Sequence, residues 1–114
     1  MFITNDTLGI QEISCQTLFE TKDTQDFILI DVRQPDEFTG ELGHIENSKL
    51  ITLGPELEEE LGRLDQTQSY IFICRSGARS AHATGYAQTL GFNKVYNMLG
   101  GMIEWNRLGY PVQY

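Results

Sequence analysis

Two uninterrupted apolar runs constrain the fold of this chain more than any other feature. "FILIDV" begins at Phe27, and "SYIFIC" begins at Ser69 and ends on Cys74. Strands that are buried on both faces have continuous apolar runs of this kind, whereas half-exposed strands alternate apolar and polar residues. Patterns typical of helices lie between the strand-like segments, which favours parallel strands joined by right-handed crossovers. The sequence therefore predicts an α/β domain built on a mainly parallel sheet.

Shorter segments complete the alternation. We expect short strands in "GIQEIS", "SKLITL" and "KVYNM". We expect helices after Ser14, which suits an N-cap, and in "GPELEEELGRL", where Leu57, Leu61 and Leu64 recur on one face. Two more helices are expected after Gly77 and in "MIEWNRLG". The chain has 114 residues, so we predict one domain over residues 10–114, preceded by a loose lead-in over residues 1–9.

Charge and composition exclude several classes of function. The formal net charge is −8, which argues against nucleic acid as the main partner. No apolar stretch approaches the roughly 18 residues that a membrane span needs, and "MFITNDTLGI" does not resemble a signal peptide. We therefore expect a cytoplasmic protein without membrane association. Two cysteines and two histidines form no metal-ligand spacing, so we expect neither a metal nor a cofactor.

The segment "CRSGARS" predicts a reactive site. Cys74 follows a predicted parallel strand, and ligands of parallel sheets bind beyond the carboxyl ends of the strands. The next helix should begin near Gly77, so that backbone N–H groups point towards the sulfur. Arg75 and Arg79 add positive charge. Cations and a helix N-terminus favour the nucleophilic thiolate, which a buried and inert cysteine would not require.

Three segments together resemble the rhodanese family of sulfurtransferases, in its small single-domain form. "CRSGARS" resembles the active loop, "DVRQPDEFTGELGHI" resembles an upstream signature, and "LGGMIEWNRLGYPV" resembles the closing segment. The segments occur in the family's order and span nearly the whole chain. One departure follows "GHI", where the family usually has Pro-Gly-Ala and this chain has Glu46 and Asn47 before Ser48. The resemblance implies a three-layer sandwich with a central sheet of about five strands flanked by helices.

The resemblance also implies a chemistry. Cys74 would take a sulfane sulfur from a small anionic donor such as thiosulfate and become a persulfide. Cyanide, a thiol or a protein sulfur acceptor would then collect that sulfur. The expected substrate-binding loop comprises Arg75, Ser76, Gly77, Ala78, Arg79 and Ser80. The two arginines could hold the oxyanion end of the donor, and the loop N–H groups could bind the persulfide.

Two other functions remain as alternatives. A non-catalytic or redox-sensing rhodanese-like module would bind a partner, but modules of that kind commonly lack the cysteine. Phosphatase or arsenate reductase chemistry is less favoured, because related phosphatases have five residues between the cysteine and the arginine. Here four residues lie between Cys74 and Arg79, which makes a tighter cradle that suits a single sulfur atom.

Several further residues are candidates with a structural alternative. Asp31 and Arg33 end a predicted strand near the same edge of the sheet. There they either orient the active loop or form a structural ion pair, for instance with Asp36 or Glu37. We expect His44 to form a hydrogen bond that fixes a loop. Trp105 either packs its helix against the domain or forms a wall of the substrate pocket, and we favour packing. Cys15 reads as an incidental thiol, with a disulfide to Cys74 as the less favoured alternative.

Overall fold

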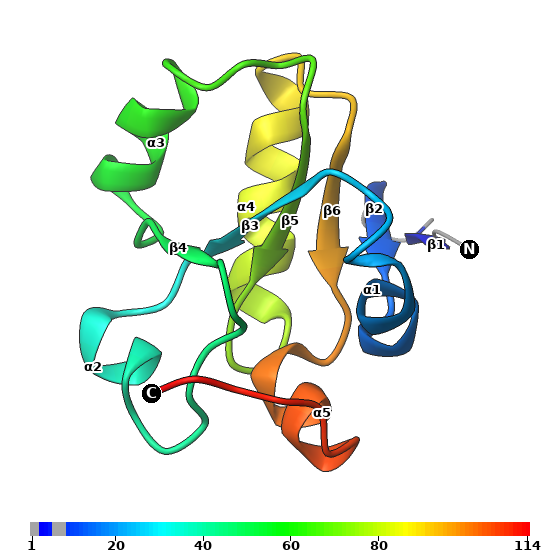
Figure 1. Ribbon diagram of the computed structural model, residues 1–114. Coiled ribbons are helices and arrows are strands. Elements are labelled where there is room, and N and C mark those ends of the chain that lie inside the picture. Colours follow the sequence, from blue (N-terminus) through cyan, green and yellow to red (C-terminus); the bar gives the residue numbers. More distant parts are fainter. Residues whose placement is uncertain (1–2, 6–8) are drawn as a thin grey trace.

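The computed structural model describes residues 3–5 and 9–114 of the chain. Its strands form one sheet in the order β1-β2-β6-β5-β3-β4 (Figure 1). The pairs from β2 to β4 are all parallel, and β1 pairs antiparallel with β2 at the edge. The strands are β1 (Ile3–Asn5), β2 (Ile10–Ile13), β3 (Phe27–Asp31), β4 (Lys49–Leu50), β5 (Ser69–Ile73) and β6 (Val95–Met98). The mainly parallel sheet that the apolar runs predict is confirmed.

The helices lie on both faces of this sheet (Figure 1). They are α1 (Cys15–Thr21), α2 (Pro35–Phe38), α3 (Pro55–Leu61), α4 (Ala78–Thr89) and α5 (Gly101–Arg107). The side chain of Ser14 caps α1 by accepting the Thr17 N–H at 3.0 Å, and Pro35 begins α2. The N-cap that the sequence predicts at Ser14 is therefore confirmed, and a proline at the first position of a helix, as in α2, is common.

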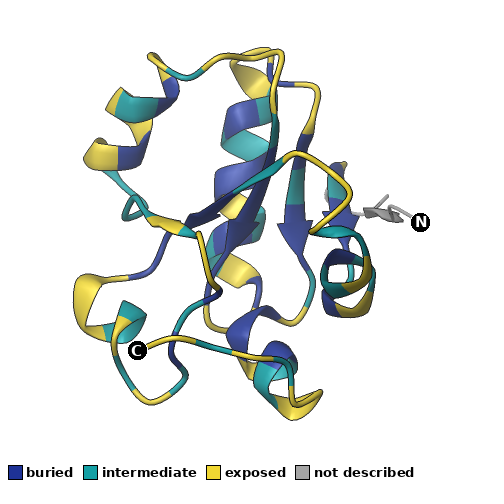
Figure 2. Ribbon diagram, in the orientation of Figure 1, coloured by how far each residue is buried: buried dark blue, intermediate teal, exposed yellow. Residues whose placement is uncertain are grey.

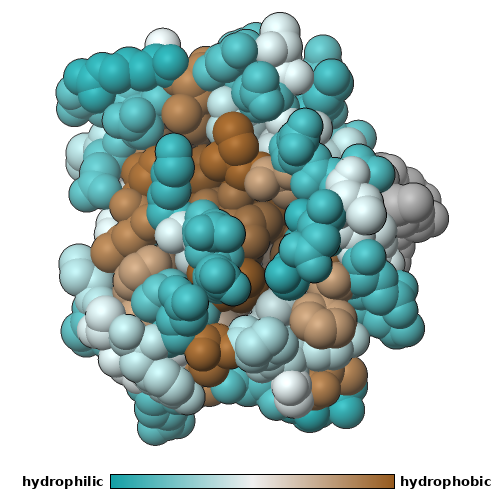
Figure 3. Space-filling model, in the orientation of Figure 1, coloured by the Kyte–Doolittle hydropathy of each residue, from teal (hydrophilic) through white to brown (hydrophobic). Residues whose placement is uncertain are grey.

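The alternation of side chains along β5 explains why its sequence is apolar throughout. Tyr70 and Phe72 pack against α3 and α4, whereas Ile71 and Ile73 pack against α1 and α5. Two core clusters result, one on each face of the sheet, and the buried residues follow the central strands (Figure 2). The fold is thus the predicted three-layer sandwich. Apolar side chains remain visible at the centre of one face, surrounded by hydrophilic ones (Figure 3).

The expectations at the edges of the domain have mixed outcomes. The predicted lead-in over residues 1–9 lies partly outside the described residues, and within it the structure places β1. "SKLITL" forms a strand of only two residues, which pairs with the end of β3. In the described part of the chain, no helix has the length and apolar character needed to cross a bilayer.

Candidate active site

Cys74 lies at the carboxyl end of the central strand β5 and is buried. The chain turns immediately after it, and α4 begins at Ala78. Gly77 caps this helix with a φ of 102°, a left-handed conformation that glycine adopts without steric cost. The sharp turn brings the first turn of α4 back over the sulfur, as the sequence predicts for a strand–loop–helix unit.

Two backbone N–H donors and one hydroxyl group surround the sulfur of Cys74. The backbone N–H of Gly77 donates to Sγ at 3.1 Å, and the backbone N–H of Ser80 does so at 3.3 Å. The hydroxyl oxygen of Ser80 also lies 3.2 Å from Sγ. Donors arranged in this way at a helix N-terminus favour negative charge on the group that they surround. The arrangement can therefore stabilise an anionic sulfur.

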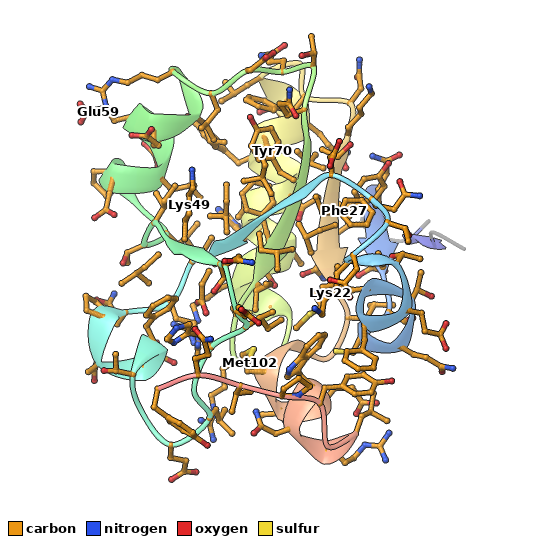
Figure 4. The ribbon with its side chains drawn as sticks, viewed as in Figure 1. Lys22, Phe27, Lys49, Glu59, Tyr70 and Met102 are labelled. Atoms are coloured by element: carbon orange, nitrogen blue, oxygen red, sulfur yellow. The ribbon has the colours of Figure 1, made fainter. Side chains whose placement is uncertain are left out.

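The carbonyl groups of the active loop are held by α5. The N–H of Met102 donates to the carbonyl of Cys74 at 2.8 Å, and the N–H of Ile103 donates to that of Arg75 at 3.0 Å. Met102 belongs to α5 and lies near the end of β5, in the same core cluster as Ile73 (Figure 4). With these carbonyl groups turned towards α5, the N–H groups of the loop are free to face the sulfur.

The two arginines of the loop have different environments. The guanidinium of Arg79 donates to both carboxylate oxygens of Glu37 on α2, at 2.7 and 2.9 Å. These hydrogen bonds lower the pKa of Glu37 from 4.5 to about 2. Arg75 is exposed and forms no ion pair with a described residue. Of these two arginines, Arg79 is therefore paired with a carboxylate, and Arg75 has no carboxylate partner among the described residues.

The structure pairs Asp31 and Arg33 with each other. Arg33 donates from Nε to Oδ1 of Asp31 at 2.8 Å and from Nη2 to Oδ2 at 2.7 Å, and both side chains are buried. The same Nη2 donates to the carbonyl of Gly43 at 2.7 Å. This ion pair ties β3 to the loop that follows α2, and it joins Asp31 and Arg33 to each other rather than to Asp36 or Glu37.

A hollow of about 290 Å³ opens beside the active loop. Its lining combines Arg75 with carboxylates from α2 and the following loop. The lining residues are Arg33, Asp36, Glu37, Gly40, Glu41, Leu42 and Arg75. The approach to the loop is therefore mixed in charge rather than uniformly cationic.

A series of hydrogen-bonded polar side chains is buried behind the Cys74 sulfur, and the sequence did not predict it. Ser80 Oγ lies 2.5 Å from Oδ1 of Asn97 on β6, and Nδ2 of Asn97 lies 3.1 Å from Oε2 of Glu12 on β2. All three residues are buried. Their separation in sequence hides the chain, because Glu12 and Asn97 are 85 residues apart.

The remaining candidates are Cys15, His44 and Trp105, and the structure shows their contacts. Cys15 donates to the carbonyl of Leu99 at 3.4 Å, and its burial and the charge of Glu104 raise the pKa of its thiol to about 12. Nδ1 of His44 lies 2.8 Å from the carbonyl of Phe38, which fixes that loop. Trp105 is buried in the helical layer. Among the described residues, no group of three or more potential ligands is placed to hold a metal.

Comparison with known proteins gives a consistent result. Residues 14–108 match the family model described as a rhodanese-like domain. A sulfurtransferase from Allochromatium vinosum is 31% identical over 90% of this chain and 94% of its own. The putative sulfurtransferase YtwF from Bacillus subtilis is 38% identical, over 86% and 92%. The crystal structure of a rhodanese-related protein from Thermoplasma volcanium superposes with a TM-score of 0.79 at 33% identity, covering 90% of this chain and 96% of that one.

Proposed function

The chain belongs to the rhodanese-like domain family, and on that premise we propose that it is a sulfurtransferase that carries sulfur on Cys74. The observation that carries this proposal is the pair of backbone N–H groups, from Gly77 and Ser80, that donate to the Cys74 sulfur at 3.1 and 3.3 Å. These backbone donors suit a sulfur that reacts as a thiolate and then becomes an anionic persulfide. The sulfurtransferase names of the relatives support the same chemistry.

With thiosulfate as donor, the first half-reaction is a displacement at sulfur. The thiolate of Cys74 attacks the sulfane sulfur, a new S–S bond forms, and the old S–S bond breaks. Sulfite leaves with the bonding electron pair, and the protein holds an anionic persulfide. The loop N–H groups of Gly77 and Ser80 are placed to stabilise the negative charge on the sulfur.

The second half-reaction returns Cys74 to the thiolate that began the first one. A nucleophile such as cyanide attacks the outer sulfur of the persulfide, and the thiolate of Cys74 leaves with the electron pair. No proton or external electron is required in either step when cyanide is the acceptor. The two steps predict ping-pong kinetics, because sulfite departs before the acceptor reacts.

Thiosulfate should add one sulfur atom to Cys74. We expect intact-protein mass spectrometry after incubation with thiosulfate and gel filtration to show this mass gain, and peptide mapping to assign it to Cys74. The added sulfur should disappear when cyanide is supplied. Cys15 serves as an internal control, because burial keeps its thiol protonated, with a pKa of about 12.

Two results would contradict the proposal. One is a protein that gains no sulfur from thiosulfate or from an alternative persulfide donor, which would favour a binding module. The other is efficient hydrolysis of an aryl phosphate at Cys74, which would favour phosphatase chemistry in spite of the short loop.

Removing Arg79 should weaken thiosulfate binding, because the Glu37 carboxylate would then be unpaired and would repel the anion. In Arg79→Ala, Glu37 keeps its negative charge beside the active loop without its partner. We expect the KM for thiosulfate to rise about tenfold, and Arg79→Ala/Glu37→Gln to recover much of that loss. Steady-state kinetics at several salt concentrations measure both effects.

The control for this prediction removes a distant positive charge. Arg63→Ala changes an exposed residue that follows α3 and pairs with Glu59 and Glu60. We expect its KM for thiosulfate to stay within about twofold of the wild type. An unchanged KM in Arg79→Ala would show that this ion pair has no part in donor binding.

A further inference from the structure

Behind the active loop, a continuous chain of hydrogen bonds links the Cys74 sulfur to a buried carboxylate. It runs from Sγ to Ser80 Oγ, from Ser80 Oγ to Asn97 Oδ1, and from Asn97 Nδ2 to Glu12 Oε2, over 3.2, 2.5 and 3.1 Å. This hydrogen-bond chain joins side chains from α4, β6 and β2. The sulfur-transfer steps described above make no use of Glu12 or Asn97, so the chain requires a separate explanation.

The donor and acceptor capacity of each side chain determines which group donates in each of these hydrogen bonds. An ionised carboxylate only accepts hydrogen bonds, so Glu12 requires the NH₂ group of Asn97 to face it. The amide oxygen of Asn97 must then face Ser80, and this oxygen also only accepts. A serine hydroxyl has a single proton. The hydroxyl proton of Ser80 is therefore committed to Asn97.

This commitment leaves Ser80 unable to donate to Cys74. The lone pairs of its Oγ face the sulfur at 3.2 Å, which suits a thiol S–H that donates towards Ser80. An ionised sulfur in the same place would meet those lone pairs instead of a proton. Only the backbone N–H groups of Gly77 and Ser80 would then stabilise the sulfur anion.

We propose that Glu12 is a positioning residue that sets the direction of this chain and thereby favours the thiol form of resting Cys74. Its negative charge fixes the Asn97 amide, the amide fixes the Ser80 hydroxyl, and the hydroxyl accepts from Cys74. The device counteracts the donors of the active loop and limits the time that the resting protein spends as a reactive thiolate. The inference rests on Cys74 being the reactive sulfur of the proposed function.

Glu12→Gln tests the proposal with a nearly isosteric change. A glutamine at this position can donate to Asn97 Oδ1, which lets the Asn97 amide turn, Ser80 accept from Asn97, and the Ser80 hydroxyl donate to the sulfur. We expect the midpoint of the pH dependence of Cys74 alkylation by iodoacetamide to fall by about one pH unit. Alkylation does not require sulfur transfer, so this result and the test of the proposed function are independent.

A double-mutant cycle separates the hydrogen-bond chain from simple loss of charge. Removing the charge of Glu12 acts on Cys74 in any background, whereas the chain acts only where Ser80 has its hydroxyl. We therefore expect Glu12→Gln to shift the midpoint at least about half a pH unit less in the Ser80→Ala background. Equal shifts in both backgrounds, or no shift in either, would overturn the proposal.

The other titratable groups near the chain are the same in every arm of the cycle. On the described elements and loops around Cys74 and Glu12 these groups are Cys15, Glu20, Asp31, Arg33, Asp36, Glu37, Tyr70, Arg75, Arg79, His82, Tyr86, Tyr96, Glu104 and Arg107. Glu58→Gln is the matched control, because Glu58 is an exposed carboxylate on α3. We expect its alkylation midpoint to equal that of the wild type.

An infrared measurement on the folded wild type keeps the test decisive if Glu12→Gln is poorly folded. The difference spectrum between the wild type and Cys74→Ser isolates the S–H stretch of Cys74 from that of Cys15. We expect this band at neutral pH, at the lowered frequency of an S–H donor, and at a higher frequency in Ser80→Ala. A missing band, or one that Ser80→Ala leaves unmoved, would refute the proposed direction of the chain.

Discussion

Cys74→Ser is expected to reduce sulfur transfer from thiosulfate to cyanide by at least about a thousandfold, with the fold unchanged. A serine hydroxyl is not ionised at neutral pH and cannot form the persulfide that links the two half-reactions. The oxygen replaces the sulfur at a position where two backbone N–H groups donate, so the buried site stays hydrogen-bonded. Thiocyanate formation under saturating thiosulfate measures the loss, and circular dichroism checks the fold.

Cys15→Ser is the matched control, since it makes the same atomic change at the other buried cysteine. The hydroxyl can still donate to the carbonyl of Leu99, as the thiol does. We expect this variant to retain sulfur transfer within about threefold of the wild type. Retention of more than a few per cent of the activity in Cys74→Ser, or an equal loss in Cys15→Ser, would remove Cys74 from its proposed role.

The sequence predicts the sheet well because the two central strands are buried on both faces. Such strands must be apolar at every position, so their signal stands apart from the alternating patterns of exposed strands. The strand in "SKLITL" is harder to delimit, because β4 is an edge strand with only two paired residues. Its length depends on pairing with β3, which a local pattern does not contain.

The departure after "GHI" is explained by backbone conformation. Asn47 takes the place of the glycine that is usual in the family, and its φ is 70°. Asparagine tolerates this left-handed conformation better than most residues do, since its short polar side chain can form local hydrogen bonds. Asn47 can therefore hold this backbone conformation without a glycine, and the polypeptide continues into β4.

The strand, turn and helix that hold residues 74–80 could be predicted, whereas the surroundings of this loop could not. Cys74 and the loop to Ser80 are contiguous, so strand, turn and helix signals place them together. The partner of Arg79 is 42 residues away, and Asn97 is 17 residues from Ser80. A glutamate in a short strand and an asparagine in another carry no local signal, and only the order of strands in the sheet makes β2 and β6 neighbours.

Gly101→Ala is expected to cause the largest loss of stability among single substitutions at the glycines near the active site. A Cβ at this position would lie 2.4 Å from the carbonyl oxygen of Arg75 and 2.5 Å from that of Cys74. The φ of Gly101 is also +60°. Because the contacts are with backbone, no side-chain rotation relieves them. We expect the free energy of unfolding to fall by about 3 kcal/mol or more.

Gly109→Ala separates the clash from the backbone conformation. Its φ is +75°, but a Cβ there would meet no atom within 4 Å. The cost should therefore be only that of a left-handed alanine, about 1 kcal/mol. Urea denaturation of both variants measures the difference between them, and equal losses would show that the loop moves aside to admit the methyl group.

Gly101→Ala should also slow sulfur transfer under conditions in which the variant is still folded. The same two carbonyl groups accept hydrogen bonds from Met102 and Ile103, and these bonds leave the loop N–H groups facing the sulfur. Displacing the carbonyls by even part of an ångström turns the donors of the loop away from Sγ. In folded Gly101→Ala, sulfur transfer should therefore fall at least about tenfold at a temperature where Gly109→Ala is fully active. Normal activity in folded Gly101→Ala would mean that contact with α5 does not position the active loop.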